Sequence, residues 1–154
     1  MSSKKILVSG CLFGWHCRYD DGDTPCLHPA FLKWKEEGRL VPVCPEVFGG
    51  LSTPRPDCQR VGERVMSCIG DDCTEQYTIG ANEALRLAKE NDVALCIMKE
   101  DSPSCGSTHI YDGTFTDTVI EGQGLAVEFL RNAGYTVLSE NMIDKAVEIL
   151  GNDE

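Results

Sequence analysis

The chain has 154 residues, 42 % of them hydrophobic, and carries a formal net charge of −11 at neutral pH. This length and composition predict one globular domain, residues 1–154, that buries its core without needing disulfide bonds. The 14 basic residues are scattered along the chain, so we expect no binding to nucleic acid or to an anionic membrane surface.

The start of the chain and its cysteine content bear on where the protein works. Residues 1–5 precede only a short apolar run, which lacks the length of a signal peptide, and no run is long enough to span a membrane. We therefore expect a cytoplasmic protein, in which thiols stay reduced. The nine cysteines, an odd number, then favour metal binding or catalysis over disulfide bonds.

Strands and helices are expected to alternate along the chain. Short apolar runs predict strands, and apolar residues that recur at helical spacing predict helices. In chain order, we expect a strand at 5–9, a loop at 12–27, a helix at 28–38, a strand at 40–43, a long loop at 45–72, a helix at 74–88, a strand at 93–98, a turn or small hairpin at 111–115, a helix at 124–134, a strand at 135–138 and a helix at 142–150.

Proline and glycine refine this outline at two places. Pro42 lies inside the second predicted strand and indicates an edge position or a break in the pairing of that strand, because proline cannot donate a hydrogen bond to a neighbouring strand. Seven Pro and Gly residues fall between Pro45 and Asp72, which leaves little room for regular elements. A loop of this length in a small domain is usually functional.

The alternation of strands and helices predicts the fold class. We expect a single α/β domain with a mainly parallel sheet and helices on both faces, a three-layer arrangement of the Rossmann-like or flavodoxin-like type. In such open sheets, ligands bind beyond the carboxyl ends of the strands.

Three cysteines come directly after predicted strands. Cys11 follows the first strand, Cys44 the second, and Cys105 lies in the loop after the third, so all three are expected at one edge of the sheet. Three thiolates can hold a cuboidal iron–sulfur cluster and leave one iron without a protein ligand, as a Lewis acid open to substrate. Structural thiols or a site for another metal are the alternatives.

Five polar residues lie near these cysteines in the sequence. Glu46 could act as general base or acid, or be a solvated loop carboxylate. Ser102 and Ser104 could bond a substrate or a cluster sulfur, or only cap the turn. Arg18 and Arg55 could bind the polar edge of a ligand, or pair with nearby aspartates at the surface.

The other six cysteines are interpreted as structural or incidental. The sequence has no Cys-x-x-Cys pair, which argues against common zinc and redox motifs. Cys96 lies inside an apolar strand and is expected to act as a small hydrophobic residue. The rest are expected in loops or near a helix start: Cys17, Cys26, Cys58, Cys68 and Cys73.

Several segments together resemble the thiouracil desulfidase family. They occur in the same order and span almost the whole chain, and Cys-Pro-Glu and Ser-Pro-Ser-Cys-Gly-Ser within them are the most specific. The segments are Ser9-Gly10-Cys11-Leu12-Phe13-Gly14, Arg18-Tyr19-Asp20, Cys44-Pro45-Glu46-Val47-Phe48-Gly49-Gly50-Leu51, Pro54-Arg55-Pro56, Lys99-Glu100-Asp101-Ser102-Pro103-Ser104-Cys105-Gly106-Ser107 and Asp112-Gly113-Thr114-Phe115.

This resemblance implies an enzyme that removes sulfur from a small thiolated base, such as 2-thiouracil, and gives uracil and hydrogen sulfide without net redox change. It implies a 4Fe-4S cluster held by Cys11, Cys44 and Cys105, whose free iron binds the substrate sulfur. Glu46 and Ser102 would form the acid/base and hydrogen-bonding pair, with Glu46 activating water.

Two other functions fit the same residues. The three cysteines could hold zinc or a cluster in a non-catalytic storage or sensing module. Alternatively, Cys105 could be the nucleophile of a thiol or persulfide sulfur carrier. A thiolated tRNA substrate is disfavoured by the acidic charge.

Overall fold

A four-stranded parallel sheet forms the centre of the molecule. The computed structural model describes residues 4–15, 25–51, 56, 58–100, 104–116 and 118–151. The strands lie in the order β2-β1-β5-β8, so the strand that contains Pro42 is at an edge, as predicted. They are β1 (Ile6–Ser9), β2 (Leu40–Val43), β5 (Leu95–Met98) and β8 (Val137–Ser139), all at predicted positions and all parallel to their neighbours.

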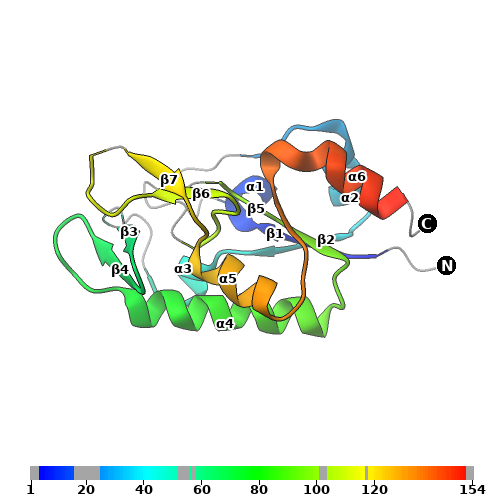
Figure 1. Ribbon diagram of the computed structural model, residues 1–154. Coiled ribbons are helices and arrows are strands. Elements are labelled where there is room, and N and C mark those ends of the chain that lie inside the picture. The colour runs from blue at the N-terminus through cyan, green and yellow to red at the C-terminus, as the bar shows by residue number, and fades with distance from the viewer. Residues whose placement is uncertain are drawn as a thin grey trace.

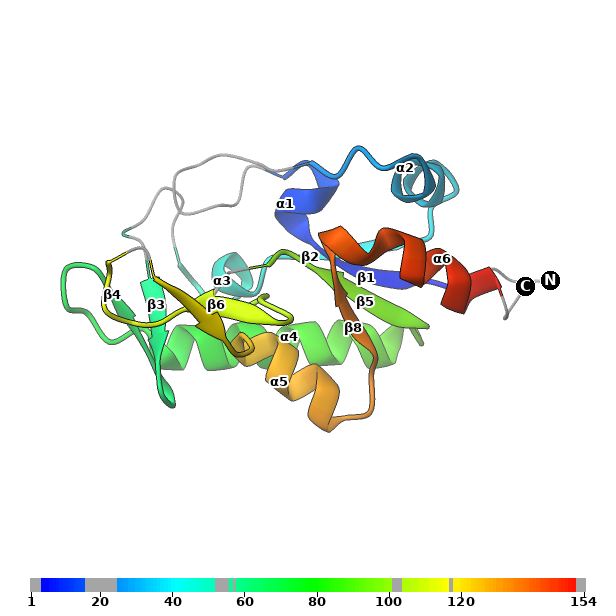
Figure 2. The same ribbon diagram turned by 45° about the horizontal axis from the view of Figure 1, so that its top comes forward.

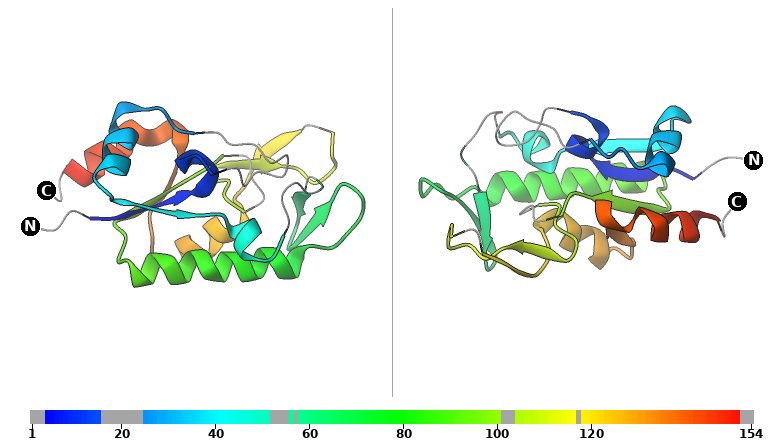
Figure 3. Two further views of the ribbon diagram at one scale, coloured as in Figure 1. Left: turned by 180° about the vertical axis from the view of Figure 1, so that it is seen from behind. Right: turned by 90° about the horizontal axis from the view of Figure 1, so that it is seen from above.

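Helices cover both faces of this sheet (Figure 1). Leu7 of β1 packs toward one face, with α4 and α5, whereas Ile6 and Val8 pack toward the other, with α1, α2 and α6. Both layers are apparent from behind and from above (Figure 3), and the predicted α/β fold class is confirmed. The helices are α1 (Gly10–Phe13), α2 (Pro29–Glu36), α4 (Thr74–Glu90), α5 (Leu125–Asn132) and α6 (Ile143–Gly151), with the short turn η1 (Glu140–Met142) before α6.

The long helix α4 also supports a one-turn helix, α3 (Pro45–Phe48). A side chain at Gly80 of α4 would place its Cβ 1.7 Å from the carbonyl oxygen of Pro45. Only glycine therefore lets the two backbones meet at this point. Because α3 carries Glu46, this close packing fixes one part of the candidate site.

Two antiparallel hairpins lie beyond the carboxyl ends of the central strands (Figure 2). The second, β6 (His109–Tyr111) with β7 (Val119–Glu121), agrees with the turn or hairpin predicted near 111–115. The first, β3 (Cys58–Val61) with β4 (Arg64–Ser67), falls in the stretch expected to lack regular elements. That expectation was wrong, because Gly62, at φ +61°, forms a tight turn between two short strands and does not interrupt them.

Among the described residues, no helix combines the length and the apolar character needed to cross a lipid bilayer.

Candidate functional site

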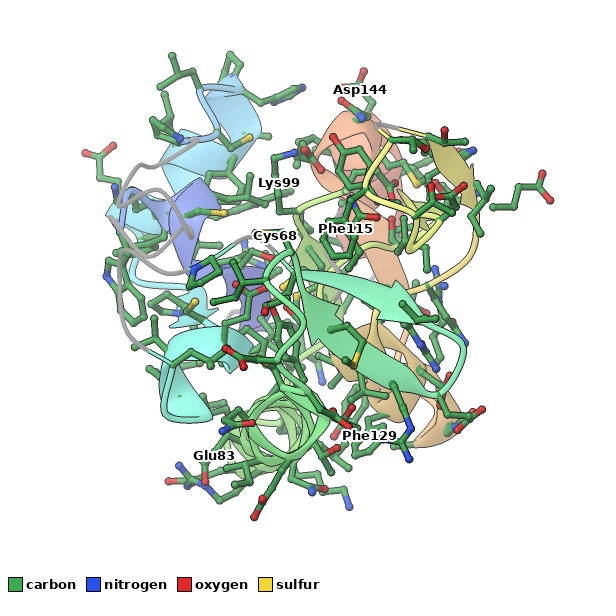
Figure 4. All side chains as sticks on the ribbon, turned by 90° about the vertical axis from the view of Figure 1, so that its left-hand side faces the viewer. Cys68, Glu83, Lys99, Phe115, Phe129 and Asp144 are labelled. Atoms are coloured by element: carbon green, nitrogen blue, oxygen red, sulfur yellow. The ribbon has the colours of Figure 1, made fainter. Side chains whose placement is uncertain are left out.

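The three candidate ligands lie at the carboxyl ends of three neighbouring strands. Cys11 is in α1, two residues after β1 ends, and Cys44 is the N-cap of α3, directly after β2. Cys105 lies in a turn between β5 and β6. Figure 4 views the molecule from this edge of the sheet, with the β3–β4 hairpin nearest the viewer. The order β2-β1-β5 therefore places the three cysteine-bearing segments side by side.

All three cysteines are largely shielded from solvent. The exposed fractions are 8 % for Cys11, 7 % for Cys44 and 5 % for Cys105. A buried thiol resists ionisation unless a positive charge or a metal compensates the thiolate. Three such thiols on converging segments therefore form a donor set suited to a metal centre.

Cys105 shows most clearly how these segments come together. Burial raises the pKa of its thiol well above the ordinary value, and the negative charge of Glu46 raises that pKa further. Hydrogen bonds from Ser104 and Ser9 lower the pKa in part, and the neighbouring Cys11 raises it again. Residues from β1, α1, α3 and the turn after β5 thus act on one sulfur atom.

A cluster and a single metal ion need different ligand spacings. Within the part of the chain that the structure describes, no three His, Cys, Asp or Glu side chains are grouped closely enough to hold one metal ion. The three ligands of a cuboidal cluster each bind a different iron, so their sulfur atoms stand farther apart than the ligands of one ion. The three cysteines at this edge supply the sulfur donors that such a cluster binds.

Glu46 is joined to the cysteine turn by a direct hydrogen bond. The Ser104 hydroxyl donates to Oε1 of Glu46 at 2.9 Å, and the same hydroxyl oxygen lies 3.4 Å from the Sγ atom of Cys105. Ser104 is fully buried, whereas Glu46 is partly exposed. This arrangement fixes one carboxylate oxygen beside the cysteine and leaves Glu46 in contact with solvent.

The N-terminus of α5 holds the turn that carries Cys105. The carbonyl oxygen of Ser104 accepts hydrogen bonds from the backbone N–H groups of Ala126 (3.0 Å) and Val127 (3.2 Å), and Gly124 N–H donates to the carbonyl oxygen of Gly106 at 2.8 Å. A Cβ on Gly124 would lie 2.3 Å from the carbonyl carbon of Ser104. Gly124 is thus a site-forming residue that sequence reasoning noticed only as a helix start.

Three predicted site residues lie outside the described residues: Arg18, Arg55 and Ser102. Their proposed roles stay predictions, as does the structural interpretation of Cys17.

The remaining described cysteines are not among the three candidate ligands, although the negative charge of Glu46 also acts on Cys58. Cys96 is fully buried in β5, where burial raises its pKa to about 12, in agreement with its interpretation as a small hydrophobic residue. Cys58 was expected in a loop but is a buried residue of β3, and burial raises its pKa to about 12 as well. Cys26, Cys68 and Cys73 are partly or fully exposed free thiols.

Comparisons of this chain with known proteins point to one family. The family model described as 2-thiouracil desulfurase matches residues 6–142. A curated relative, the Bacillus subtilis (strain 168) protein named "Uncharacterized protein YbbK", is 40 % identical over an alignment of 149 residues that covers 90 % of this chain and 97 % of the relative. A solved structure, of the [4Fe-4S]-dependent thiouracil desulfidase TudS, matches with a TM-score of 0.95 and 38 % identity, over 97 % of this chain and 99 % of the other.

Proposed function

Because the chain belongs to the 2-thiouracil desulfurase family, we propose that it is a 4Fe-4S-dependent desulfidase of a small thiolated pyrimidine. The reaction exchanges the sulfur of a thiocarbonyl for the oxygen of water, so 2-thiouracil and water give uracil and hydrogen sulfide. No electrons are gained or lost in this exchange. The observation that supports this function best is the contact of Glu46 with Ser104 beside the buried Cys105.

The proposed cluster ligands are Cys11, Cys44 and Cys105. Sulfur donors are those that iron–sulfur clusters use, and the burial of all three thiols favours a centre that compensates their charge. A cluster bound in this way would supply an iron without a protein ligand, which acts as a Lewis acid toward the thiocarbonyl sulfur.

Glu46 is the proposed general base. The hydrogen bond from Ser104 orients one oxygen of the carboxylate, and the partial exposure of Glu46 lets water reach the side chain. Glu46 would take a proton from water as that water attacks the carbon that bears sulfur, and then return the proton to the leaving sulfur. In this proposal Ser102 assists Glu46, while Ser104, Arg18 and Arg55 contact the polar edge of the thiolated pyrimidine.

A free base, or a compound of similar size, is the proposed substrate. The net charge of −11 opposes the approach of a polyanion, whereas a neutral pyrimidine is not repelled. The test measures the desulfuration rate with 2-thiouracil and with a thiolated oligonucleotide at equal concentration and ionic strength. Preference for the oligonucleotide would show that the substrate assignment is wrong.

The activity test compares two isosteric changes on the reconstituted protein. Glu46→Gln keeps the shape of the side chain but removes the base, and Glu83→Gln makes the same change at an exposed ion pair on α4. We expect Glu46→Gln to lower uracil and sulfide formation by about 100-fold or more with its iron content unchanged, and Glu83→Gln to behave like the wild type. Equal rates in all three proteins would show that Glu46 is not the base, and a reconstituted wild type that forms no uracil would favour a non-catalytic cluster-binding or sensing module.

A further inference from the structure

Glu100 is a buried carboxylate with an unusually complete set of hydrogen bonds. It lies two residues after β5 and is 9 % exposed. Its Oε1 accepts the backbone N–H groups of Ser107 (2.9 Å), Thr108 (2.8 Å) and His109 (2.8 Å). Its Oε2 accepts the hydroxyl groups of Ser107 (3.0 Å) and Thr108 (2.8 Å). Five donors therefore converge on one side chain.

These donors keep Glu100 ionised inside the protein. Burial alone would raise the pKa of the carboxyl group, but the hydrogen bonds from His109, Thr108 and Ser107 lower it to about 2. Hydrogen bonds to an ionised acceptor are about twice as strong as those between neutral groups. The contact is therefore a strong local link between two parts of the backbone.

The position of this link in the chain gives it a particular consequence. Glu100 and Ser107 stand at the two ends of the segment whose described part carries Ser104 and Cys105. Binding of Ser107 by Glu100 thus closes this segment at its base. Each end is also anchored elsewhere, because Glu100 N–H donates to Oε1 of Glu140 (2.8 Å) and Arg131 donates to the carbonyl oxygen of Ser107 (2.6 Å).

We propose that Glu100 is a positioning residue of the metal centre, which closes the base of the Cys105 segment and so fixes Cys105 and, through Ser104, the carboxylate of Glu46. The role of Cys105 as a ligand rests on the proposed function, whereas the closure of the segment is a property of the chain alone. Glu100 itself reaches neither substrate nor cluster in this proposal.

Local opening of the segment is the quantity that tests this role. A buried thiol reacts with an alkylating reagent only when the surrounding structure opens, so its labelling rate reports the free energy of that opening. The full-length reduced protein is labelled anaerobically with N-ethylmaleimide before reconstitution, and mass spectrometry of peptides gives a rate for each cysteine. Cys96 reports global unfolding, since it is fully buried in the central strand β5.

The variants form a graded series with a matched control. Glu100→Gln keeps an oxygen for the backbone donors but loses the charge, Glu100→Ala removes every acceptor, and Glu83→Gln makes the neutral change at an exposed site. We expect Cys105 to be labelled at least about tenfold faster in Glu100→Gln, faster still in Glu100→Ala, and at the wild-type rate in Glu83→Gln. Cys96 should be labelled more slowly than Cys105 in every variant, and its rate in Glu100→Gln should rise by no more than the loss of global stability allows.

An unchanged Cys105 rate in Glu100→Gln, or a Cys105 rate no faster than that of Cys96, would overturn the proposal. If Glu100→Ala does not fold, these two comparisons in Glu100→Gln still decide. After reconstitution, release of iron to a chelator, followed by visible absorbance, should be faster in Glu100→Gln than in Glu83→Gln, and equal release would also contradict it. A wild-type protein that takes up no cluster would refute the proposed function, while the labelling result would still decide the role of Glu100.

Discussion

Replacement of Gly124 by alanine tests how α5 holds the turn that carries Cys105. The new Cβ would lie 2.3 Å from the carbonyl carbon of Ser104, 2.5 Å from its oxygen and 2.7 Å from the nitrogen of Cys105. Ordinary van der Waals contact begins at 3.4 Å, so the two backbones must separate by 3.4 − 2.3 = 1.1 Å. No side chain can rotate away to relieve this contact, because all three atoms belong to the backbone.

The same separation weakens three backbone hydrogen bonds between the turn and the start of α5. Overpacking of this kind typically destabilises a protein by about 1–3 kcal/mol, and each weakened hydrogen bond adds up to about 1 kcal/mol. The smaller backbone entropy of alanine in the unfolded chain offsets roughly 0.4–1 kcal/mol. We therefore expect a net loss of about 2–4 kcal/mol in the free energy of unfolding.

Gly122→Ala is the matched control, two residues away. Its Cβ would meet only side-chain carbons of Ile110, at 3.1 Å, and these can move by a few tenths of an ångström. Urea denaturation gives the stability of both variants, and the iron content after anaerobic reconstitution shows whether the site still binds a cluster. Equal stability and equal iron content in Gly124→Ala and Gly122→Ala would refute the claim that this close approach positions Cys105.

Three further predictions concern single side chains at or near the site. Ser104→Ala removes the hydrogen bond that orients Glu46 and should lower kcat for desulfuration by about tenfold, measured with iron content as the control; an unchanged kcat would contradict the orienting role. In the reduced wild-type protein at pH 8, an alkylating reagent should modify the exposed Cys68 and leave Cys96 unmodified, because burial raises the pKa of Cys96 to about 12. Early labelling of Cys96 in peptide mass spectra would argue against this packing. The pKa of Glu100 in the folded state is about 2, below its ordinary value of 4.5, so the carboxylate stabilises the fold above pH 4.5 and loses this effect as the pH falls toward 2. The difference in unfolding free energy between wild type and Glu100→Gln should shrink over this pH range. A constant difference would contradict the lowered pKa.

The sequence predicts the central sheet and the position of its cysteines because both depend on local signals. Continuous apolar runs mark buried parallel strands; Cys11 and Cys44 follow such runs within two residues, and Cys105 lies in the loop after a third. The edge position of β2 could be predicted from Pro42, which lacks a backbone donor. The order of the neighbouring strands then brings distant cysteines to one edge.

Short elements and long-range contacts could not be predicted in this way. The helices α1 and α3 are four residues long, too short to show helical periodicity. The β3–β4 hairpin has short strands within a stretch rich in glycine and proline. The hydrogen bond between Ser104 and Glu46 joins residues 58 positions apart, and no local pattern indicates it.

Glu100 illustrates the same limit for a single residue. In the sequence, a glutamate after a strand resembles a solvated loop carboxylate. Its burial follows only from the fold, which turns three backbone N–H groups and two hydroxyl groups toward it. Its hydrogen-bonding role is therefore identified by a set of contacts in the folded chain.

Iron and acid-labile sulfide content after anaerobic reconstitution tests the proposed metal centre most directly. We predict about four iron atoms per chain in the wild type and in Cys68→Ser, which changes an exposed thiol outside the site. Separate replacement of Cys11, Cys44 or Cys105 by alanine should greatly reduce the iron content. A wild-type protein without a cluster, or three alanine variants that keep the full iron content, would contradict the account.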